Sequence, residues 1–298
     1  MRSGAWGSTV RRLPAFAGLY LGLLLPLRWL GSADPGSQWA AFAGSALGLV
    51  AAGVAGAVLI RTHGRTAGAL GLAWSRATGG EILRGLGIGA SAMAVPLLLL
   101  LAGGALRYGP DAGGPAELAA GMAVDFGFLA VAAMAEEVLF RGYPFQLIAR
   151  EFGPAFATLS TSAGFALAHA GNPNVSGLAM ANIFLAGLLL AAAYLRTRSL
   201  WFASAVHVGW NWTVAAAADL PVSGLDIMDT PLYDPVLAGP GWLTGGTFGP
   251  EGGLAATLAA CLAILVVVRW DRVAEAPAMK ALRPLIDRDE TGERVVSG

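Results

Sequence analysis

Eight long apolar runs constrain this 298-residue chain more than any other feature of its sequence. Each is close to the roughly 17–25 residues that a helix needs to cross a bilayer. Only 13% of all residues are charged, against about 25% in soluble domains. We therefore predict an all-α polytopic membrane protein with about eight transmembrane helices, at residues 13–30, 39–60, 85–106, 126–135 with the acidic motif that follows, 153–168, 175–195, 200–218 and 252–268.

The first run, residues 13–30, also has the form of a signal peptide. Basic residues precede it, and Gly31-Ser32-Ala33 is a possible cleavage site. The run is long for the apolar part of a signal peptide, and cleavage would leave an odd number of spans, so a retained helix is favoured. The predicted organisation is a cytoplasmic tail at 1–12, a single transmembrane helical domain at 13–270, and a charged cytoplasmic tail at 271–298 that we expect to be poorly ordered.

Lysine and arginine are distributed unevenly among the predicted loops. With the N-terminus inside and alternating spans, Arg28 and Arg107 are the only two of the 19 basic residues that fall outside. This asymmetry predicts that both termini are cytoplasmic. We expect the protein in the plasma membrane, as the inner membrane of a bacterium. The outer loop at 219–251 then carries five acidic residues, five prolines and no basic residue. We expect a solvated connector without regular structure there, rather than a lid.

The run at 126–135 leads directly into two carboxylates and a guanidinium, those of Glu136, Glu137 and Arg141. Charged side chains at bilayer depth are costly and usually functional. On a helix, Glu137 and Arg141 are four residues apart and can form an ion pair, so we predict that both support the site. Glu136 projects about 100° away around the helix and remains available for chemistry.

Polar residues on two later predicted helices can meet Glu136. Phe165 and His169 share one helix face, and so do His207 and Asn211, because the members of each pair are four residues apart. A helix rises about 1.5 Å per residue, which places four residues about 13–22 Å from the cytoplasmic ends of their helices: Glu136, His169, His207 and Asn211. We therefore predict a buried polar site between helices 4, 5 and 7.

These depths require a long fourth helix. It has to run past Arg141 as far as Arg150, with Arg141 buried against Glu137, and Pro144 can kink it there. If it ended at Arg141, we would expect Glu136 to lie at the surface, out of reach of His169.

The motifs Glu136-Glu137-x-x-x-Arg141, Phe165-x-x-x-His169 and His207-x-x-x-Asn211 follow one another along the chain. In this order they resemble the three motifs of the CPBP family of intramembrane endopeptidases. That family includes the type II CAAX prenyl endopeptidases and bacteriocin-processing or self-immunity proteins. The resemblance covers about residues 121–215 and implies a membrane protease with these residues at its active site.

Two mechanisms use these side chains. In the first, a desolvated Glu136 takes a proton from water with the help of His169, and His207 and Asn211 donate to the oxyanion. In the second, Glu136, His169 and His207 bind a zinc ion that keeps one position open for water. Because the H-E-x-x-H signature is missing, we favour the metal-independent mechanism and expect no cofactor, with Zn²⁺ as the alternative.

Two other classes of function remain open. A proton-coupled transporter could use the same buried glutamate and histidines, and a scaffold or immunity factor could keep the fold without catalysis. No internal repeat of the transporter type is visible, and the intact motifs count against a non-catalytic protein. The predicted partners are a membrane-associated protein or peptide substrate and the lipid bilayer, with no nucleic acid; no oligomeric state is indicated.

Four further polar residues have simpler interpretations. Asp125 is expected at the outer interface as a solvated acid, and His63, in an arginine-rich loop, is expected to be solvated. Asn172 and Asn174 flank Pro173 and predict a turn, which could also help to line the site.

Overall fold

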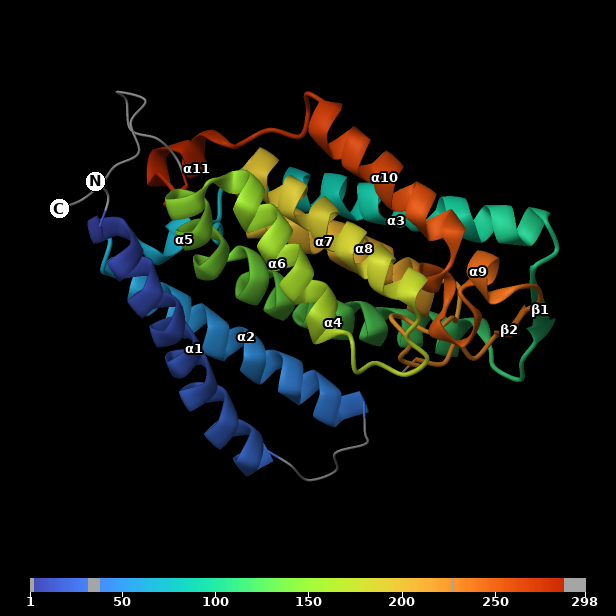
Figure 1. Cartoon of the computed structure of the whole chain (residues 1–298). Coiled ribbons are helices and arrows are strands. Elements are labelled where there is room, and N and C mark those ends of the chain that lie inside the picture. The colour runs from blue at the N-terminus through green and yellow to red at the C-terminus, as the bar shows by residue number, and fades with distance from the viewer. Residues whose placement is uncertain (1–2, 32–37, 227, 287–298) are drawn as a thin grey trace.

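The computed structural model describes residues 3–31, 38–226 and 228–286, and Figure 1 shows them as a bundle of helices. The longer helices are α1 (Ser3–Gly31), α2 (Gln38–Arg61), α3 (Thr78–Ala102), α4 (Pro115–Arg141), α5 (Tyr143–Phe152), α6 (Pro154–Ala168), α7 (Gly177–Thr197), α8 (Leu200–Ala215) and α10 (Leu254–Arg269). The shorter elements are η1 (Ala67–Leu70), β1 (Leu106–Pro110), β2 (Tyr233–Leu237), α9 (Gly241–Thr244), η2 (Gly246–Phe248), η3 (Pro250–Gly252) and α11 (Pro277–Leu282).

Length and apolar composition together divide the helices of the described chain. In the described part of the chain, four helices are long and apolar enough to cross a membrane: Trp39–Arg61, Thr78–Ala102, Pro115–Phe152 and Gly177–Thr197. A helix forms at each of the eight predicted runs, but α6 has 15 residues and α8 and α10 have 16 each. These three are shorter than the roughly 17 residues of a usual span. The chain is a helical membrane protein, and the number of eight spans stays a prediction.

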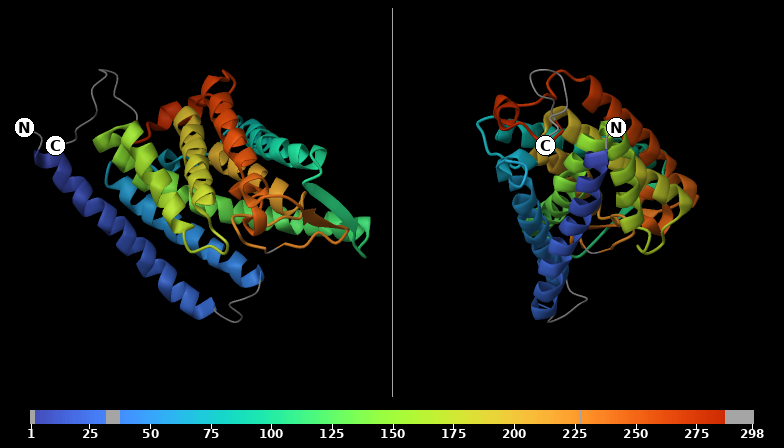
Figure 2. Two further views of the ribbon diagram at one scale, coloured as in Figure 1. Left: turned by 45° about the vertical axis from the view of Figure 1, so that its right-hand side comes forward. Right: turned by 60° about the vertical axis from the view of Figure 1, so that its left-hand side comes forward.

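Glycines bring α3 and α8 into close contact near the middle of the bundle. A Cβ at Gly85 would lie 2.7 Å from Cβ of Ala205, one at Gly89 would meet the carbonyl oxygen of Val206, and one at Gly209 would meet the backbone of α3. Small residues allow membrane helices to approach in this way. The contact fixes α8, which carries two of the predicted site residues. Figures 1 and 2 show α1 and α2 side by side at the opposite edge of the bundle from α3 and α10.

The fourth predicted helix is broken next to Pro144, where only a kink was expected. α4 ends at Arg141 and α5 begins at Tyr143, with Gly142 between them. Pro144 lies at the start of α5, where its missing N–H and fixed φ are tolerated, whereas in a helix interior its ring would clash with a carbonyl one turn earlier. A Cβ at Gly142 would also meet the carbonyl oxygen of Val138. Glycine and proline together therefore turn the chain here.

The expectation that a helix ending at Arg141 would place Glu136 at the surface, out of reach of His169, is also wrong. Although α4 ends at Arg141, the Arg141 side chain is fully buried, and Glu136 lines an internal cavity together with His169. The reason is that α5 packs against the bundle, where Phe145 and Leu147 are both buried. The break therefore leaves the end of α4 inside the protein.

The loop at 219–251, called the outer loop after its predicted orientation, contains regular structure, contrary to prediction. β2 pairs antiparallel with β1, with Leu237 opposite Leu106 and Tyr233 opposite Pro110. Proline is tolerated in such a strand because a two-stranded ribbon leaves half of its backbone groups unpaired. The short elements α9, η2 and η3 follow before α10.

The C-terminal segment is partly ordered, which is a second correction. α11 follows α10, Met279 and Leu285 are buried, and the backbone N–H of Leu285 donates to Oε1 of Gln146 at 2.9 Å. Apolar residues among the charged ones explain this packing. The prediction of poor order is therefore wrong for 271–286, and residues 287–298 lie outside the described residues.

Candidate active site

The ion pair of the acidic motif forms inside the protein, which confirms that prediction. Nη1 of Arg141 donates to Oε1 of Glu137 at 3.1 Å, and neither side chain has any exposed surface. Nη2 of Arg141 donates to the carbonyl oxygen of Gly187 on α7 at 3.0 Å. The guanidinium carbon also lies 4.7 Å from the centre of the Phe165 ring, a favourable cation–π distance. Arg141 thus connects α4 to α6 and α7.

Glu137 has a second partner that the sequence analysis missed. Its Oε1 atom lies 3.1 Å from Nδ1 of His207 on α8. A carboxylate accepts hydrogen bonds only, so Nδ1 carries the proton and donates it to Glu137. The Glu137–Arg141 pair therefore orients the imidazole of His207 in addition to neutralising its own charges.

Glu136 points to the other side of the same histidine. Its Oε2 atom lies 3.9 Å from Nε2 of His207. Within the described residues, this oxygen is buried and accepts no hydrogen bond. A buried acceptor without a partner is uncommon in native structures, so this atom is suited to receive a proton or a water molecule.

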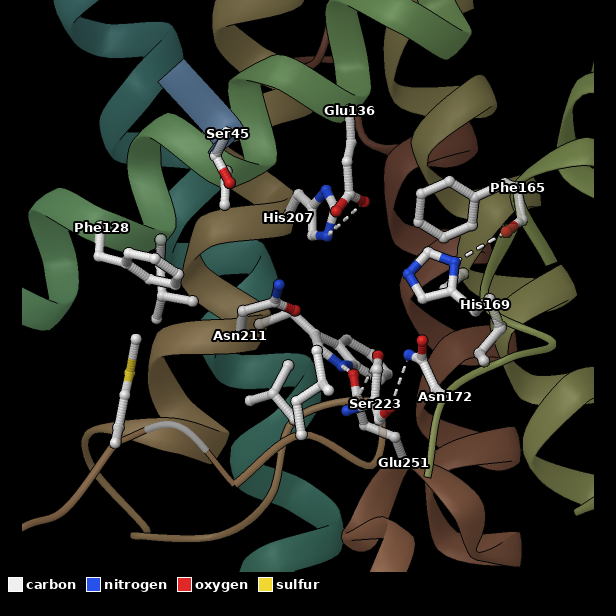
Figure 3. Close-up of a pocket in the computed structure, with 18 of the residues that line it drawn as sticks. Ser45, Phe128, Glu136, Phe165, His169, Asn172, His207, Asn211, Ser223 and Glu251 are labelled. Atoms are coloured by element: carbon white, nitrogen blue, oxygen red, sulfur yellow. Dashed lines mark hydrogen bonds and ion pairs between the residues drawn. The ribbon is translucent and has the colours of Figure 1, made fainter. Parts of the chain in front are cut away.

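His169 is held by its own helix at the end of α6. Its Nδ1 atom donates to the carbonyl oxygen of Phe165 at 2.8 Å, because a carbonyl can only accept. The Phe165 and His169 rings lie 4.7 Å apart. In a neutral imidazole the other nitrogen, Nε2, then keeps its lone pair, and Figure 3 shows this ring facing the same space as Glu136, His207 and Asn211.

That space is a cavity of about 1250 Å³ lined by all four predicted catalytic residues. Glu136 comes from α4, His169 follows α6, and His207 and Asn211 come from α8. The lining is otherwise largely apolar and also includes Ala41, Ser45, Phe128, Phe165, Asn172, Ile183, Trp210, Val222 and Ser223. Together these residues enclose room for an extended segment of polypeptide.

Asp125 is buried in this cavity, so the prediction of a solvated acid is wrong. Only 6% of its surface is exposed, although it lies three turns from Glu136 along α4. The same cavity is lined by Ala41 and Ser45 of α2 and by Asp226 and Asp229 of the outer loop. α2 also packs against α4.

The outer loop forms one wall of the cavity through Glu251, which the sequence analysis placed in a solvated connector. Glu251 is 8% exposed. Its Oε1 atom accepts from Nε1 of Trp210 at 2.7 Å, and its Oε2 atom accepts from the backbone N–H and the hydroxyl of Ser223. Its carbonyl oxygen accepts from Asn182 on α7 at 2.7 Å. A solvated connector would not make these bonds, and a single acid among glycines gave no signal of them.

The predicted turn after His169 is confirmed. Asn174 has a positive φ of 58°, a conformation that asparagine tolerates better than most residues. Asn172 lines the cavity, and its side-chain amide donates to the carbonyl oxygen of Ser223 at 2.8 Å. The turn thus joins the outer loop to the end of α6.

His63 is half-buried and contacts three side chains, so the prediction of a solvated histidine is wrong. Its ring nitrogens lie 2.9–3.1 Å from Nη1 of Arg12, 3.0 Å from Nη1 of Arg150 and 3.1 Å from the hydroxyl of Tyr143. Burial, together with the charges of Arg12, Arg150 and Arg65, lowers the pKa of His63 to about 4. The loop is covered because α1 and α5 pack next to it.

The residues suggested as zinc ligands do not gather into a metal site. Among the described residues, no three or more His, Cys, Asp or Glu side chains come close enough to hold one ion. Glu136 approaches His207, and because Nδ1 of each histidine is engaged, Nε2 is the nitrogen that each could offer to a metal. The metal-free mechanism and the zinc alternative both stay predictions.

Comparison with known proteins supports a protease. The family described as "Type II CAAX prenyl endopeptidase Rce1-like" matches residues 119–213. This match confirms the resemblance of the chain to the CPBP intramembrane endopeptidases, and the matched segment contains every predicted site residue. No curated protein and no solved structure matches the chain. Glu251 and Ser223 lie beyond the matched segment, although they line the same cavity.

Proposed function

We propose that this protein is an intramembrane endopeptidase that hydrolyses a peptide bond of a membrane-associated protein or peptide. Glu136, His169, His207 and Asn211 are its catalytic side chains. The observation that carries the proposal is that these four residues line one cavity of about 1250 Å³, within the segment that matches the protease family.

Glu136 and His169 activate the water in this mechanism. A water molecule between them donates one hydrogen to the carboxylate and the other to Nε2 of His169. Glu136 takes its proton as the water oxygen bonds to the carbonyl carbon of the scissile peptide. The carboxyl then gives that proton to the leaving nitrogen as the C–N bond breaks. One water is consumed, and both side chains return to their starting states.

Asn211 and His207 stabilise the oxyanion that forms on the carbonyl oxygen. The Asn211 amide donates from its NH₂ group, and fixed donors of this kind act strongly in a site that excludes water. In neutral His207 the ring proton is on Nδ1, which donates it in a hydrogen bond to Glu137. His207 can therefore donate from Nε2 only as the imidazolium. The Glu137–Arg141 pair keeps the ring in that orientation.

The reaction proceeds without a bound metal in this proposal. We expect purified protein to retain peptide cleavage in the presence of strong chelators, and elemental analysis to find no stoichiometric zinc. Stoichiometric zinc that is lost in both His169→Ala and His207→Ala would establish the metal-dependent alternative instead.

The outer loop, which lines the site, lies outside the cytoplasm in this proposal, with both termini inside. Single cysteines placed at 235–245 in a Cys261→Ala background test this orientation. We expect an impermeant thiol reagent to label them in intact cells. Labelling only after the cells are opened would overturn the orientation but not the enzyme.

Comparison of membrane proteomes tests the function directly. Cells that carry Glu136→Ala should accumulate at least one unprocessed membrane protein relative to wild type, and cells that carry Asp234→Asn, a change to an exposed acid of β2, should not. The accumulated protein then serves as the substrate of purified enzyme. An unchanged proteome and no cleavage of that kind would refute the proposal, and pH-coupled flux without cleavage would indicate a transporter.

A further inference from the structure

A polypeptide segment that enters the catalytic cavity needs hydrogen-bond partners for its own backbone. Each peptide unit brings an N–H donor and a C=O acceptor, and an unpaired polar group in apolar surroundings costs free energy. The lining of the cavity is largely apolar. The few polar side chains that remain available in it therefore decide where the backbone of a substrate can lie.

Two polar side chains of the lining are already committed to the protein itself. The side-chain amide of Asn182 donates to the carbonyl oxygen of Glu251 at 2.7 Å, and its Oδ1 atom accepts from Oγ1 of Thr257 at 2.6 Å. The carboxylate of Glu251 accepts from Trp210 and from Ser223. These bonds join the helices to the outer loop, so we do not assign either side chain to the substrate.

Asn172 differs from them because only half of its amide is engaged. Its Nδ2 atom donates to the carbonyl oxygen of Ser223 at 2.8 Å, whereas no hydrogen bond from the described residues reaches its Oδ1 atom. Asn172 lines the cavity, and Figure 3 shows its amide oxygen on the side of His169, away from the bond to Ser223. An amide oxygen has two lone pairs, so this atom is a ready acceptor beside the reacting groups.

The outer loop fixes the orientation of this amide. Ser223 has a positive φ of 50°, which is uncommon for residues other than glycine, and its N–H and hydroxyl both donate to Glu251. A Cβ at Gly224 would meet the carbonyl oxygen of Pro173, so the loop and the turn after α6 lie in close contact. An amide is planar, and with its nitrogen held by Ser223 the oxygen of Asn172 points to the opposite side.

We propose that Asn172 binds the substrate: its Oδ1 atom accepts a hydrogen bond from a main-chain N–H next to the scissile peptide bond. The inference rests on the proposed protease function and adds a contact that the catalytic residues do not make. Such a bond recognises an extended polypeptide backbone whatever its side chains. Because Ser223 holds the same amide, the outer loop contributes to substrate affinity through Asn172.

Two asparagines of one turn provide a matched pair of variants. Asn174 is exposed and donates to the carbonyl oxygen of Thr247 at 3.4 Å, and glycine can keep its positive φ. The substrate is a synthetic peptide that spans the cleavage site of the membrane protein accumulated in Glu136→Ala cells. Asn172→Ala should raise KM about three- to tenfold, through loss of one hydrogen bond, and change kcat less than about threefold. Asn174→Gly should change KM less than about twofold.

Asn172→Ala also removes the bond to Ser223 and so loosens the loop, for which reason the substrate is varied as well. Each amide that flanks the scissile bond is replaced in turn by an ester, which lacks the N–H. At one position the ester should raise KM of the wild type about three- to tenfold. It should add little to Asn172→Ala, because both changes remove the same bond, whereas Asn174→Gly should respond to it as the wild type does.

Two results would overturn the inference while the protease remains. The first is an unchanged KM in Asn172→Ala, and the second is a set of ester effects that add to those of Asn172→Ala at every position. If Asn172→Ala does not fold, Asn172→Ser takes its place with the same expectation, since its hydroxyl is too short to replace the amide oxygen. Wild-type protein that cleaves no such peptide would refute the proposed function together with this contact.

Discussion

The two walls of the cavity are built in different ways. The helix wall, Glu136, His169, His207 and Asn211, projects from α4, the end of α6 and α8, and helices fix these positions by regular spacing. The loop wall, Asn172, Ser223 and Glu251, is held by hydrogen bonds between segments far apart in the chain. Both walls face the same cavity (Figure 3), but only the helix wall lies wholly within the segment that matches the protease family.

The two walls differ in the chemistry that their side chains can perform. The helix wall holds the groups that can move protons and stabilise charge, whereas the carboxylate of Glu251 is fully engaged by Trp210 and Ser223. A carboxylate whose oxygens already accept hydrogen bonds is a poor base, but it holds the segments that donate to it in place. We infer that changes in the helix wall act on turnover and that changes in the loop wall act on stability and substrate affinity.

The largest effect is expected for Glu136→Gln. Loss of the base should reduce turnover by roughly 100–10,000-fold and leave the melting temperature nearly unchanged. Glu137→Gln should act oppositely, because it leaves Arg141 buried without its carboxylate, at a cost of about 3–5 kcal/mol in the free energy of unfolding. Melting curves in detergent and cleavage rates decide between them. If Glu136→Gln is the less stable of the two, the roles of the acids are reversed.

Asn211→Ala and Asn172→Ala compare one amide from each wall. Asn211→Ala should lower kcat by about 100–1,000-fold if this amide is an oxyanion donor, whereas Asn172→Ala should lower it only a few-fold. Adding Asn211→Ala to Glu136→Gln should cost little more, because the residues act in one step. Similar kcat values for the two single variants would remove Asn211 from the reaction.

Glu251→Gln tests the loop wall itself. The amide cannot accept from both Trp210 and Ser223 as the carboxylate does, so the free energy of unfolding should fall by about 1–3 kcal/mol. We expect KM to rise and kcat to change little, and limited proteolysis to cut the 219–251 loop sooner. Asp234→Asn, in the same loop but exposed, is the control. A large fall in kcat with unchanged KM would place Glu251 in the chemistry instead.

The smallest effect is expected at His63, outside both walls. The folded pKa of about 4 lies below the ordinary value of 6.5, so the unfolded chain binds a proton first as the pH falls through this window. Stability should therefore decrease between pH 6.5 and 4, and this part of the decrease should disappear in His63→Gln. Thermal melts in detergent at several pH values measure the difference. Acid sensitivity that persists unchanged would have to originate in other groups, including those of the cavity walls.

Regular helices explain how much of the molecule could be predicted. Spacing by four residues placed His207 with Asn211 and Glu137 with Arg141, and the apolar runs located the helices. The break at Gly142 also had a signal, since Pro144 favours the start of a helix. Nothing local marked Glu251 or Asp125, because their burial depends on contacts between α4, α8 and the outer loop. A sequence pattern reports neighbours on one helix, whereas these contacts join residues distant in the sequence.

The short length of α6 has a consequence for the surrounding lipid, because α6 exposes Phe156 and Leu159 whereas most of α8 is buried. With 15 residues, α6 spans about 22 Å, less than the hydrocarbon thickness of about 30 Å. If α6 crosses the membrane as predicted, the bilayer beside it thins locally to cover it. The leaflets beside the catalytic residues would then be indented, which shortens the path of a water molecule from bulk solvent to Glu136. Hydrolysis needs that water, and the same indentation would let a polar stretch of polypeptide reach the cavity without crossing a full leaflet.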